Sequence, residues 1–195
     1  AAPLLCAGAI GYRSLKLAGP IDGQNLGLTG FGASAHLVLK TVRHRFPRTR
    51  VFVFARREAE RRFALDLGAH WAGETGETSP ERLDAVIDTT PAWRPVVGAL
   101  HNLRAGGRLV VNAIRKEETD KDALLDLDYP AHLWMEKEIR SVANVTRTDI
   151  REFLTIAAEI PLRPRIEVYS LPEANRALAD LKDGRIRGAK VLSLD

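Results

Sequence analysis

Short apolar runs alternate with amphipathic segments along most of the chain. The apolar run at 25–29 predicts a buried strand, and 33–45 predicts a helix that carries Val38 and Val42 on one face. Further strands are expected at 51–55, 71–72, 83–88, 108–112 and 139–145, and further helices at 58–67, 93–103 and 150–159. Gly68 is expected to end one of these helices, because glycine accepts the left-handed conformation that commonly follows a helix.

This alternation of strands and helices predicts the fold class. Because the strands are mostly unbroken apolar runs, both faces of their sheet should be covered, as in a parallel sheet. Right-handed crossovers then give an α/β doubly wound sheet of about six strands with helices on both faces. The alternative is another kind of α/β sandwich. We expect 105–107 to be a turn and the charged stretch 116–122 to be a loop.

The pattern changes after Pro161 and Pro164, which interrupt the helical spacing. Three elements are expected beyond them: a strand at 165–169, a helix at 172–181 and a strand at 189–194. We therefore divide the chain into a main domain at 1–164, which includes a leading helix, and a C-terminal segment at 165–195.

Composition excludes several classes of function. The formal net charge is +4 at pH 7, with no basic block, which favours a small anionic ligand over nucleic acid. The single cysteine, Cys6, excludes an intrachain disulfide and a metal cluster made only of cysteines. No apolar run approaches about 20 residues, so we expect no membrane span. The first residues lack the basic region of a signal peptide, and we expect a cytoplasmic protein.

A glycine pattern follows the first predicted strand directly: Gly30-Phe31-Gly32-Ala33-Ser34-Ala35. Gly30 would permit the tight turn into the helix, Gly32 would let the backbone approach a pyrophosphate, and the small Ala35 would let the helix pack close to the sheet. Free N–H groups at the start of that helix would face the phosphates. The context of strand, turn and helix favours dinucleotide binding, and the alternative is an ordinary tight turn.

The end of the second predicted strand indicates which dinucleotide. NAD sites usually carry an acidic residue there that binds the ribose hydroxyls, whereas this chain has Ala55, Arg56 and Arg57. Guanidinium groups in place of that carboxylate suit a 2′-phosphate, so we expect NADP(H) to be preferred over NAD(H). The alternative is that both arginines are solvated, although cations at the start of a helix are unfavourable unless an anion binds.

Several segments, taken in their order and spacing, give the chain a specific resemblance to a known family: AAPLLCAGAIGYRSL, GFGASAHL, ALDLGAHWAG, LRAGGRLVVN and ANRALADLKDGRIRGAKVL. They resemble the zinc-dependent alcohol dehydrogenases of the medium-chain dehydrogenase/reductase family. The resemblance implies a Rossmann-type dinucleotide-binding domain at 1–164 and, at 165–195, a segment of a catalytic domain that this chain lacks. It also implies a homodimer, formed through the edge that the strand at 139–145 leaves, and a small alcohol or aldehyde as the substrate of the full-length enzyme.

The resemblance gives Cys6 a possible role. It matches the last protein ligand of the family's catalytic zinc, and the other ligands, a cysteine and a histidine, would lie in the absent domain. None of the histidines, His36 and His44 included, lies in a matching motif. Zinc is therefore expected only in a full-length parent, and in the isolated chain Cys6 is expected to be a small buried hydrophobic side chain.

Further cofactor contacts are implied by the resemblance at later strand ends and in the tail. Thr89 and Thr90 would flank the adenosine, and Arg187 or Lys190 would lie near the pyrophosphate. The nicotinamide amide would bind the backbone at two further strand ends: Asn112 and Ala113, and Ser141 and Val142. The alternative for each position is an ordinary strand-end or surface residue.

The leading functional hypothesis is the cofactor domain of an NADP(H)-dependent alcohol dehydrogenase or aldehyde reductase. Such an enzyme transfers hydride between the nicotinamide ring and a carbonyl that zinc polarises. The chain itself carries no catalytic residue, so we expect it to be inactive without the missing domain. The alternatives are a non-catalytic dinucleotide-binding or interaction module, and a dinucleotide sensor that would need an effector domain.

Overall fold

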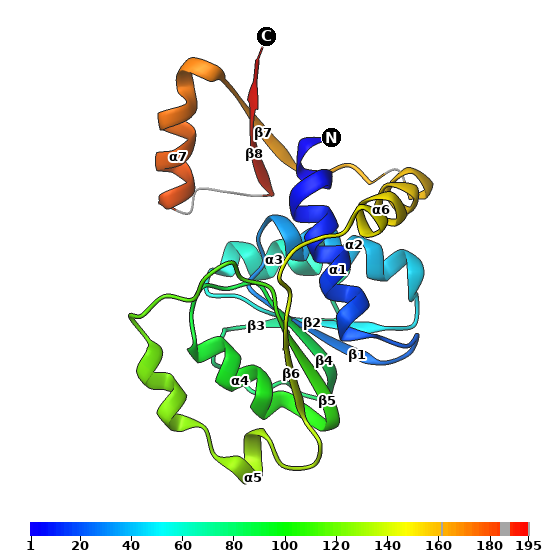
Figure 1. Cartoon of the computed structure of the whole chain (residues 1–195), viewed down its shortest axis with the longest axis vertical. Coiled ribbons are helices and arrows are strands. Elements are labelled where there is room, and N and C mark those ends of the chain that lie inside the picture. The colour runs from blue at the N-terminus through cyan, green and yellow to red at the C-terminus, as the bar shows by residue number, and fades with distance from the viewer. Residues whose placement is uncertain (161, 184–187, 195) are drawn as a thin grey trace.

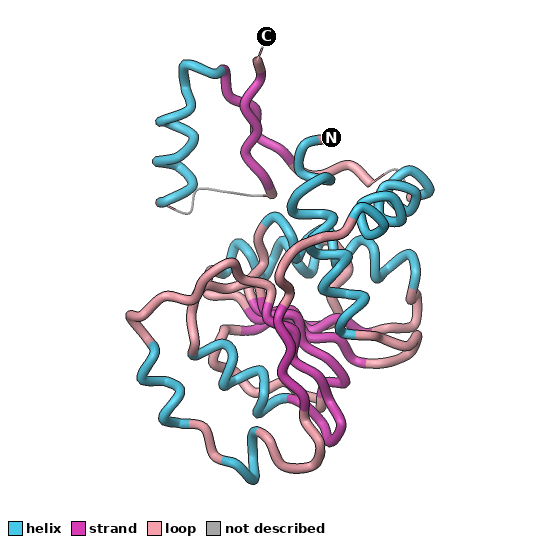
Figure 2. The backbone as a smooth tube through the Cα atoms, viewed as in Figure 1, coloured by secondary structure: helices cyan, strands magenta, loops and turns pink. Residues whose placement is uncertain are grey.

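The computed structural model describes residues 1–160, 162–183 and 188–194, and its strands form two separate sheets (Figures 1 and 2). The larger sheet is parallel, with the strand order β3-β2-β1-β4-β5-β6. Its strands are β1 (Asn25–Thr29), β2 (Arg50–Phe54), β3 (Trp71–Gly73), β4 (Leu83–Asp88), β5 (Leu103–Val111) and β6 (Glu138–Ser141). The direction of winding reverses between β1 and β4, which places a crevice at the carboxyl ends of these central strands.

Helices cover both faces of this sheet (Figure 1). Their bounds are η1 (Leu4–Gly8, a π-helical turn), α1 (Ala9–Ala18), α2 (Ala33–Arg45), α3 (Glu58–Asp66), α4 (Arg94–Asn102), η2 (Lys121–Asp126, a 3₁₀ turn), α5 (Tyr129–His132) and α6 (Arg147–Glu159). Helices α1, α2 and α3 contribute to the apolar cluster on one face, and α4 contributes to the cluster on the other. None of the described helices is both long and apolar enough to cross a bilayer.

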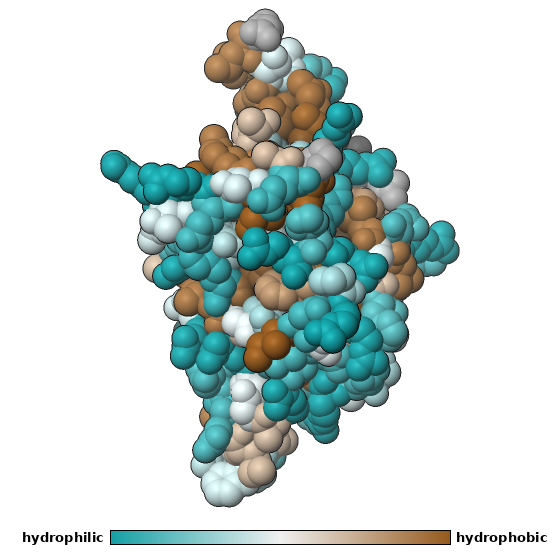
Figure 3. All heavy atoms as spheres, turned by 90° about the vertical axis from the view of Figure 1, so that its right-hand side faces the viewer, coloured by the Kyte–Doolittle hydropathy of each residue, from teal (hydrophilic) through white to brown (hydrophobic). Residues whose placement is uncertain are grey.

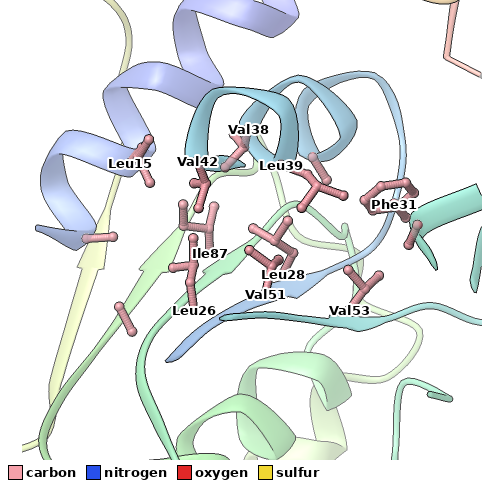
Figure 4. Packing of buried hydrophobic residues seen from close by; sticks show 14 of the residues in the cluster. Leu15, Leu26, Leu28, Phe31, Val38, Leu39, Val42, Val51, Val53 and Ile87 are labelled. Atoms are coloured by element: carbon pink, nitrogen blue, oxygen red, sulfur yellow. The ribbon is translucent and has the colours of Figure 1, made fainter. Parts of the chain in front are cut away.

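Strand β2 shows how the sheet is buried on both sides. Val51 and Val53 pack into the cluster with α1 and α2, while Phe52 and Phe54, on the opposite face, pack against α4. Figure 4 shows helix residues that point toward strand residues on the first of these faces: Leu15, Val38, Leu39 and Val42 above Leu26, Leu28, Val51 and Ile87. Because side chains alternate along a strand, a run that is apolar at every position fills both layers.

A buried carboxylate ties α6 to α1. Asp149 closes a capping box with Thr146 at the start of α6, and its Oδ1 accepts a hydrogen bond from Lys16 Nζ at 3.1 Å. Burial by itself raises the pKa of Asp149, but the hydrogen bonds from Thr146 and Lys16 and the charge of Arg13 outweigh it and lower the pKa to about 2. The carboxylate is therefore ionised throughout the physiological range and holds two helices together.

A smaller unit stands apart from the main sheet, on the side where the chain begins (Figure 1). It consists of β7 (Ile166–Ser170), η3 (Leu171–Glu173), α7 (Ala174–Lys182) and β8 (Ala189–Ser193), with β7 and β8 paired in parallel. Large apolar side chains are exposed on it: Ile166, Val168, Leu171, Leu178, Leu181, Leu192 and Leu194. Figure 3 shows hydrophobic surface at the upper end of the molecule. Its assignment to an absent catalytic domain remains a prediction.

The predicted fold class is confirmed, with six parallel strands and helices on both faces. The prediction of a turn at 105–107 was wrong, because β5 already begins at Leu103. The pairing with β4 shifts register there, and Gly106 takes a φ of 68°, so these residues form an irregularity within the strand. Strand β6 does form the edge of the sheet, but it ends at Ser141 and is shorter than predicted.

Helical turns were missed between β5 and β6. The stretch expected to be a loop at 116–122 runs into η2, and α5 follows it. Both are short, and turns of this length have too few residues to show a helical period. Helix α6 also begins at Arg147, three residues earlier than predicted at 150, because the Thr146–Asp149 capping box sets its start.

Candidate functional site

The glycine turn lies at the carboxyl end of β1. Gly30 has a φ of 77°, and its N–H donates to the carbonyl of Phe54 at 2.8 Å. A Cβ built on Gly30 would lie 2.9 Å from Thr89 Oγ1. Both the backbone conformation and the contact with the end of β4 therefore require glycine at this position.

Gly32 borders open space at the start of α2. A Cβ built on it would meet nothing within 4 Å, and no side chain caps the helix. The carbonyl of Gly32 accepts a hydrogen bond from His36 Nδ1 at 3.1 Å, which leaves the N–H groups at the helix start uncapped. The first N–H groups of any α-helix lack intrahelical partners, so this helix end presents donors beside an empty volume that a phosphate could fill.

Burial determines the state of His36. The ring is fully buried, and burial lowers its pKa below the usual value, so it is neutral at pH 7. Its Nδ1–H donates to the Gly32 carbonyl, while Nε2 is buried without a hydrogen-bond partner among the described residues. His36 is thus a buried packing residue on α2, and its hydrogen bond supports the glycine turn.

A cavity of about 410 Å³ opens at this point. Its lining comes from the glycine turn and from the segments that follow β2, β3, β4 and β5: Gly30, Phe31, Gly32, Ala33, Ser34, Arg56, Glu60, Thr75, Thr89, Thr90, Pro91, Ala92, Pro95, Asn112 and Glu117. All these segments lie at the carboxyl ends of parallel strands, where open α/β sheets bind their ligands.

Arg56 and Arg57, which follow β2, contact different parts of the molecule. Arg56 lines the cavity, whereas Arg57 Nη2 donates to the carbonyl of Asp183 at 3.1 Å, at the end of α7. Arg61 supports the strand end, since its Nη1 donates to the carbonyls of Ala55 at 2.9 Å and Arg56 at 3.0 Å. The cation that faces the cavity from β2 is therefore Arg56.

A buried ion pair between Asp88 and Lys116 lies at the carboxyl end of β4. Asp88 is fully buried, and its Oδ1 accepts hydrogen bonds from Thr29 Oγ1 at 2.6 Å and from Thr90 Oγ1 at 2.8 Å. Its Oδ2 pairs with Lys116 Nζ, whose side chain is only 9% exposed. Thr89 Oγ1 donates to the Thr29 carbonyl at 2.9 Å. The two threonines at the cavity wall are thus held by hydrogen bonds.

The structure brings together most of the sequence-predicted site residues. The following line the cavity: Gly30, Phe31, Gly32, Ala33, Ser34, Arg56, Thr89, Thr90 and Asn112. The following do not line it: Ala35, Arg57, Ala113, Ser141 and Val142. Ala35 lies on α2 and is buried in the apolar cluster between that helix and the sheet. Arg187 lies outside the described residues. Lys190 donates to Glu167 in the small sheet, away from the cavity lining.

Sequence reasoning missed several residues of the cavity wall: Glu60, Thr75, Pro91, Ala92, Pro95 and Glu117. Glu60 is the important one, because it places a carboxylate in the same lining as Arg56. Glu60 lies in the first turn of α3, whereas Arg56 precedes that helix, so no helical spacing connected the two residues in the sequence.

The prediction that Cys6 is buried was wrong. It lies exposed on the π-helical turn η1, ahead of the residues that pack on the sheet. Among the described residues, no three His, Cys, Asp or Glu side chains are grouped so that they could hold a metal ion. The described residues therefore do not fit a complete zinc site, which needs about three protein ligands.

The fold and the glycine turn together define the class of protein to which the chain belongs. A parallel sheet in this strand order, with such a turn at its central crevice, is the Rossmann-type fold of dinucleotide-binding domains. Residues 57–192 match the family model for zinc-binding dehydrogenase, and the chain belongs to this family.

Individual relatives agree with this family. The chain is 41% identical over 191 residues to a probable alcohol dehydrogenase, AdhA, of Mycobacterium tuberculosis. The alignment covers 98% of this chain and 53% of AdhA. A cinnamyl alcohol dehydrogenase from Sorghum bicolor superposes with a TM-score of 0.80 at 26% identity, covering 98% of this chain and 54% of that one. A CAD from Helicobacter pylori has the same fold, with a TM-score of 0.80 at 23% identity over 97% of this chain and 52% of that one. The chain thus spans about half the length of these relatives, and its resemblance to the alcohol dehydrogenases is confirmed.

Proposed function

We propose that this chain binds a nicotinamide dinucleotide in the cavity at the glycine turn, as the cofactor-binding portion of an alcohol dehydrogenase. The observation that carries the proposal is Gly32, where a Cβ would enter open space beside the uncapped start of α2. A pyrophosphate there would accept hydrogen bonds from the first N–H groups of the helix. The similarity to a probable alcohol dehydrogenase and to a cinnamyl alcohol dehydrogenase supports the reaction class, and the Helicobacter pylori structure is a complex with NADP(H).

The nicotinamide ring supplies the hydride chemistry when the cofactor is bound. The residues of this chain bind and orient it. The helix start would hold the phosphates, and Thr89 and Thr90 would form the wall next to them. Asn112 Nδ2 is buried without a hydrogen-bond partner in the described chain, so this donor is available to a bound group at the end of β5.

Arg56 favours NADP(H) over NAD(H), because it presents a guanidinium to the cavity where other sites carry a carboxylate. Glu60 opposes this preference, since a carboxylate in the same lining would repel a 2′-phosphate. Ala55 is only 1% exposed and does not line the cavity, so an acidic residue there would be buried. Arg56 is therefore the position at which cofactor choice can be changed.

Fluorescence titration with NADPH and NADH tests both parts of the proposal. The wild-type chain should bind both, and NADPH more tightly. Loss of a charge-assisted contact costs about 1.5–3 kcal/mol, so Arg56→Ser should weaken NADPH binding about ten- to a hundredfold and leave NADH binding nearly unchanged. Arg62→Ser is the matched control, because Arg62 pairs with Glu58 on the exposed side of α3. Equal affinities in the wild type would contradict the preference, and binding of neither cofactor would contradict the function.

The isolated chain should bind no catalytic zinc tightly and should not oxidise alcohols above background. One thiolate, Cys6, makes a weak site without partner ligands. Elemental analysis after dialysis against a mild chelator tests this expectation, and stoichiometric zinc would refute it. Because the described residues do not form a complete zinc site, a dinucleotide-binding module without catalysis is the second candidate function.

A homodimer through β6 also belongs to the proposal. Strand β6 is the edge of the main sheet, and Ile139 on it is 48% exposed. An edge strand presents unpaired backbone groups that a second copy could pair with. Sedimentation equilibrium at micromolar concentrations should give twice the chain mass of 21.5 kDa, and a mass of 21.5 kDa would remove this part of the proposal.

A further inference from the structure

The segment that follows β5 is fastened to the loop that follows β4. The N–H of Glu117 donates to the carbonyl of Pro91 at 2.8 Å. The carboxylate of Asp120 accepts hydrogen bonds from the N–H groups of Trp93 at 2.8 Å and Arg94 at 2.9 Å, and so caps α4 from outside that helix. We call residues 116–120 the strap.

Lys116 makes the central contacts of this strap. Besides its ion pair with Asp88, its Nζ donates to the carbonyls of Thr90 at 2.9 Å and Ala92 at 2.8 Å. The ammonium also lies 5.8 Å from the centre of the Trp93 ring. All three protons of the ammonium group are therefore used, in a site where the lysine side chain is 9% exposed and the aspartate is not exposed at all.

These contacts act on the cavity wall. Thr90 and Ala92 line the cavity, and their carbonyls accept hydrogen bonds from Lys116. Lys116 itself does not line the cavity. The ion pair needs only Asp88, so the additional hydrogen bonds to the carbonyls of Thr90 and Ala92 fix the position of the loop that forms the cavity wall.

We propose that Lys116 is a positioning residue of the dinucleotide site, which sets the loop 89–92 at the distance from the glycine turn that the bound cofactor requires. This inference rests on the proposed function, and it adds a residue that touches neither the glycine turn nor the cavity. A loop that is not held in place must be ordered when ligand binds, which lowers affinity.

The test compares Lys116→Met with Lys121→Met, a control in the neighbouring turn whose lysine forms an exposed pair with Glu118. Hydrogen exchange of the cofactor-free chain should become faster at 89–94 in Lys116→Met and stay unchanged in β1. NADPH affinity should fall about tenfold or more, as expected for the loss of hydrogen bonds to a charged donor. Lys121→Met should match the wild type in both measurements.

A double variant, Asp88→Asn with Lys116→Met, separates positioning from charge compensation. It removes the buried charge that Lys116→Met leaves unpaired, so stability should largely return. The carbonyls of Thr90 and Ala92 still lack their donor, so NADPH affinity should stay low and exchange at 89–94 should stay fast. Recovery of wild-type affinity and exchange in the double variant would overturn the proposal, as would wild-type behaviour of Lys116→Met.

The measurements distinguish failure of cofactor binding from failure of the role of Lys116. If the wild-type chain binds no dinucleotide, the proposed function is wrong, while hydrogen exchange still decides whether Lys116 holds the loop. If the wild type binds NADPH and Lys116→Met binds it equally well, the proposed function stands and the role of Lys116 is refuted. If Lys116→Met does not fold, the double variant carries both measurements.

Discussion

The main sheet and the β7–β8 unit are built from the same local pattern and differ in what covers them. Both consist of parallel strands joined through a helix. In β1, every residue after the first is buried, whereas in β7 only Tyr169 is buried. The pattern of the sequence is thus sufficient to form strands, but a strand is buried only where a second layer reaches it. In the small unit, α7 covers one face and leaves the other with exposed apolar side chains.

The largest difference should appear on deleting a strand side chain from each region. Phe52 is fully buried and Val168 is 58% exposed. Phe52→Ala should lower the free energy of unfolding by about 3–5 kcal/mol, because it leaves a cavity in the core, and Val168→Ala should change it by less than about 0.5 kcal/mol. Urea denaturation followed by circular dichroism gives both values. Similar losses in the two variants would mean that the small unit is buried in solution.

A smaller effect is expected at the polar link inside the main domain. The folded pKa of Asp149 is about 2 against an unfolded value near 3.8, so this carboxylate stabilises the fold above about pH 4, and that stabilisation is lost as the pH falls through 2. The difference corresponds to about 2 kcal/mol. Asp149→Asn should lower stability at pH 7 by about this amount and flatten the acid limb of the stability profile. An unchanged acid limb in the variant would show that other carboxylates determine it.

The smallest effect on global stability is expected from disrupting the small unit itself. Tyr169 is 2% exposed, and its hydroxyl donates to Asp180 at 3.0 Å. Tyr169→Ala should abolish amide protection in β7 and β8, while the free energy of unfolding of the main sheet changes by less than about 0.5 kcal/mol. Tyr169→Phe, which keeps the ring, is the control. A parallel loss of protection in β1 would contradict the independence of the two regions.

The parts of the fold that were predictable depend on backbone and burial rules that act locally. Gly30 and Gly32 could be assigned from sequence, because a strand-to-helix turn that approaches phosphate excludes side chains at defined positions. The doubly wound arrangement, with helices on both faces of a parallel sheet, follows from right-handed crossovers in the same way. These rules need no knowledge of distant contacts.

The parts that failed depend on contacts across the chain. Lys116 looked like a residue of a charged loop, and only its pairing with Asp88 shows that it is buried. Cys6 was expected to be buried from its residue type, whereas its exposure depends on which residues pack against the first turn. Glu60 lies in the first turn of α3, beyond the strand end, and only the folded arrangement brings it into the same lining as Arg56.

The link between α1 and α6 has a consequence for biosynthesis. Tyr12 donates to Glu152 at 3.0 Å across 140 residues of sequence, beside the Lys16–Asp149 pair. At about 5–20 residues per second, a ribosome needs on the order of ten seconds to make the chain between these partners. During that time α1 can dock on α2 but cannot complete its polar contacts. The polar contacts between α1 and α6 can therefore form only after α6 has been synthesised, late in translation of the main domain.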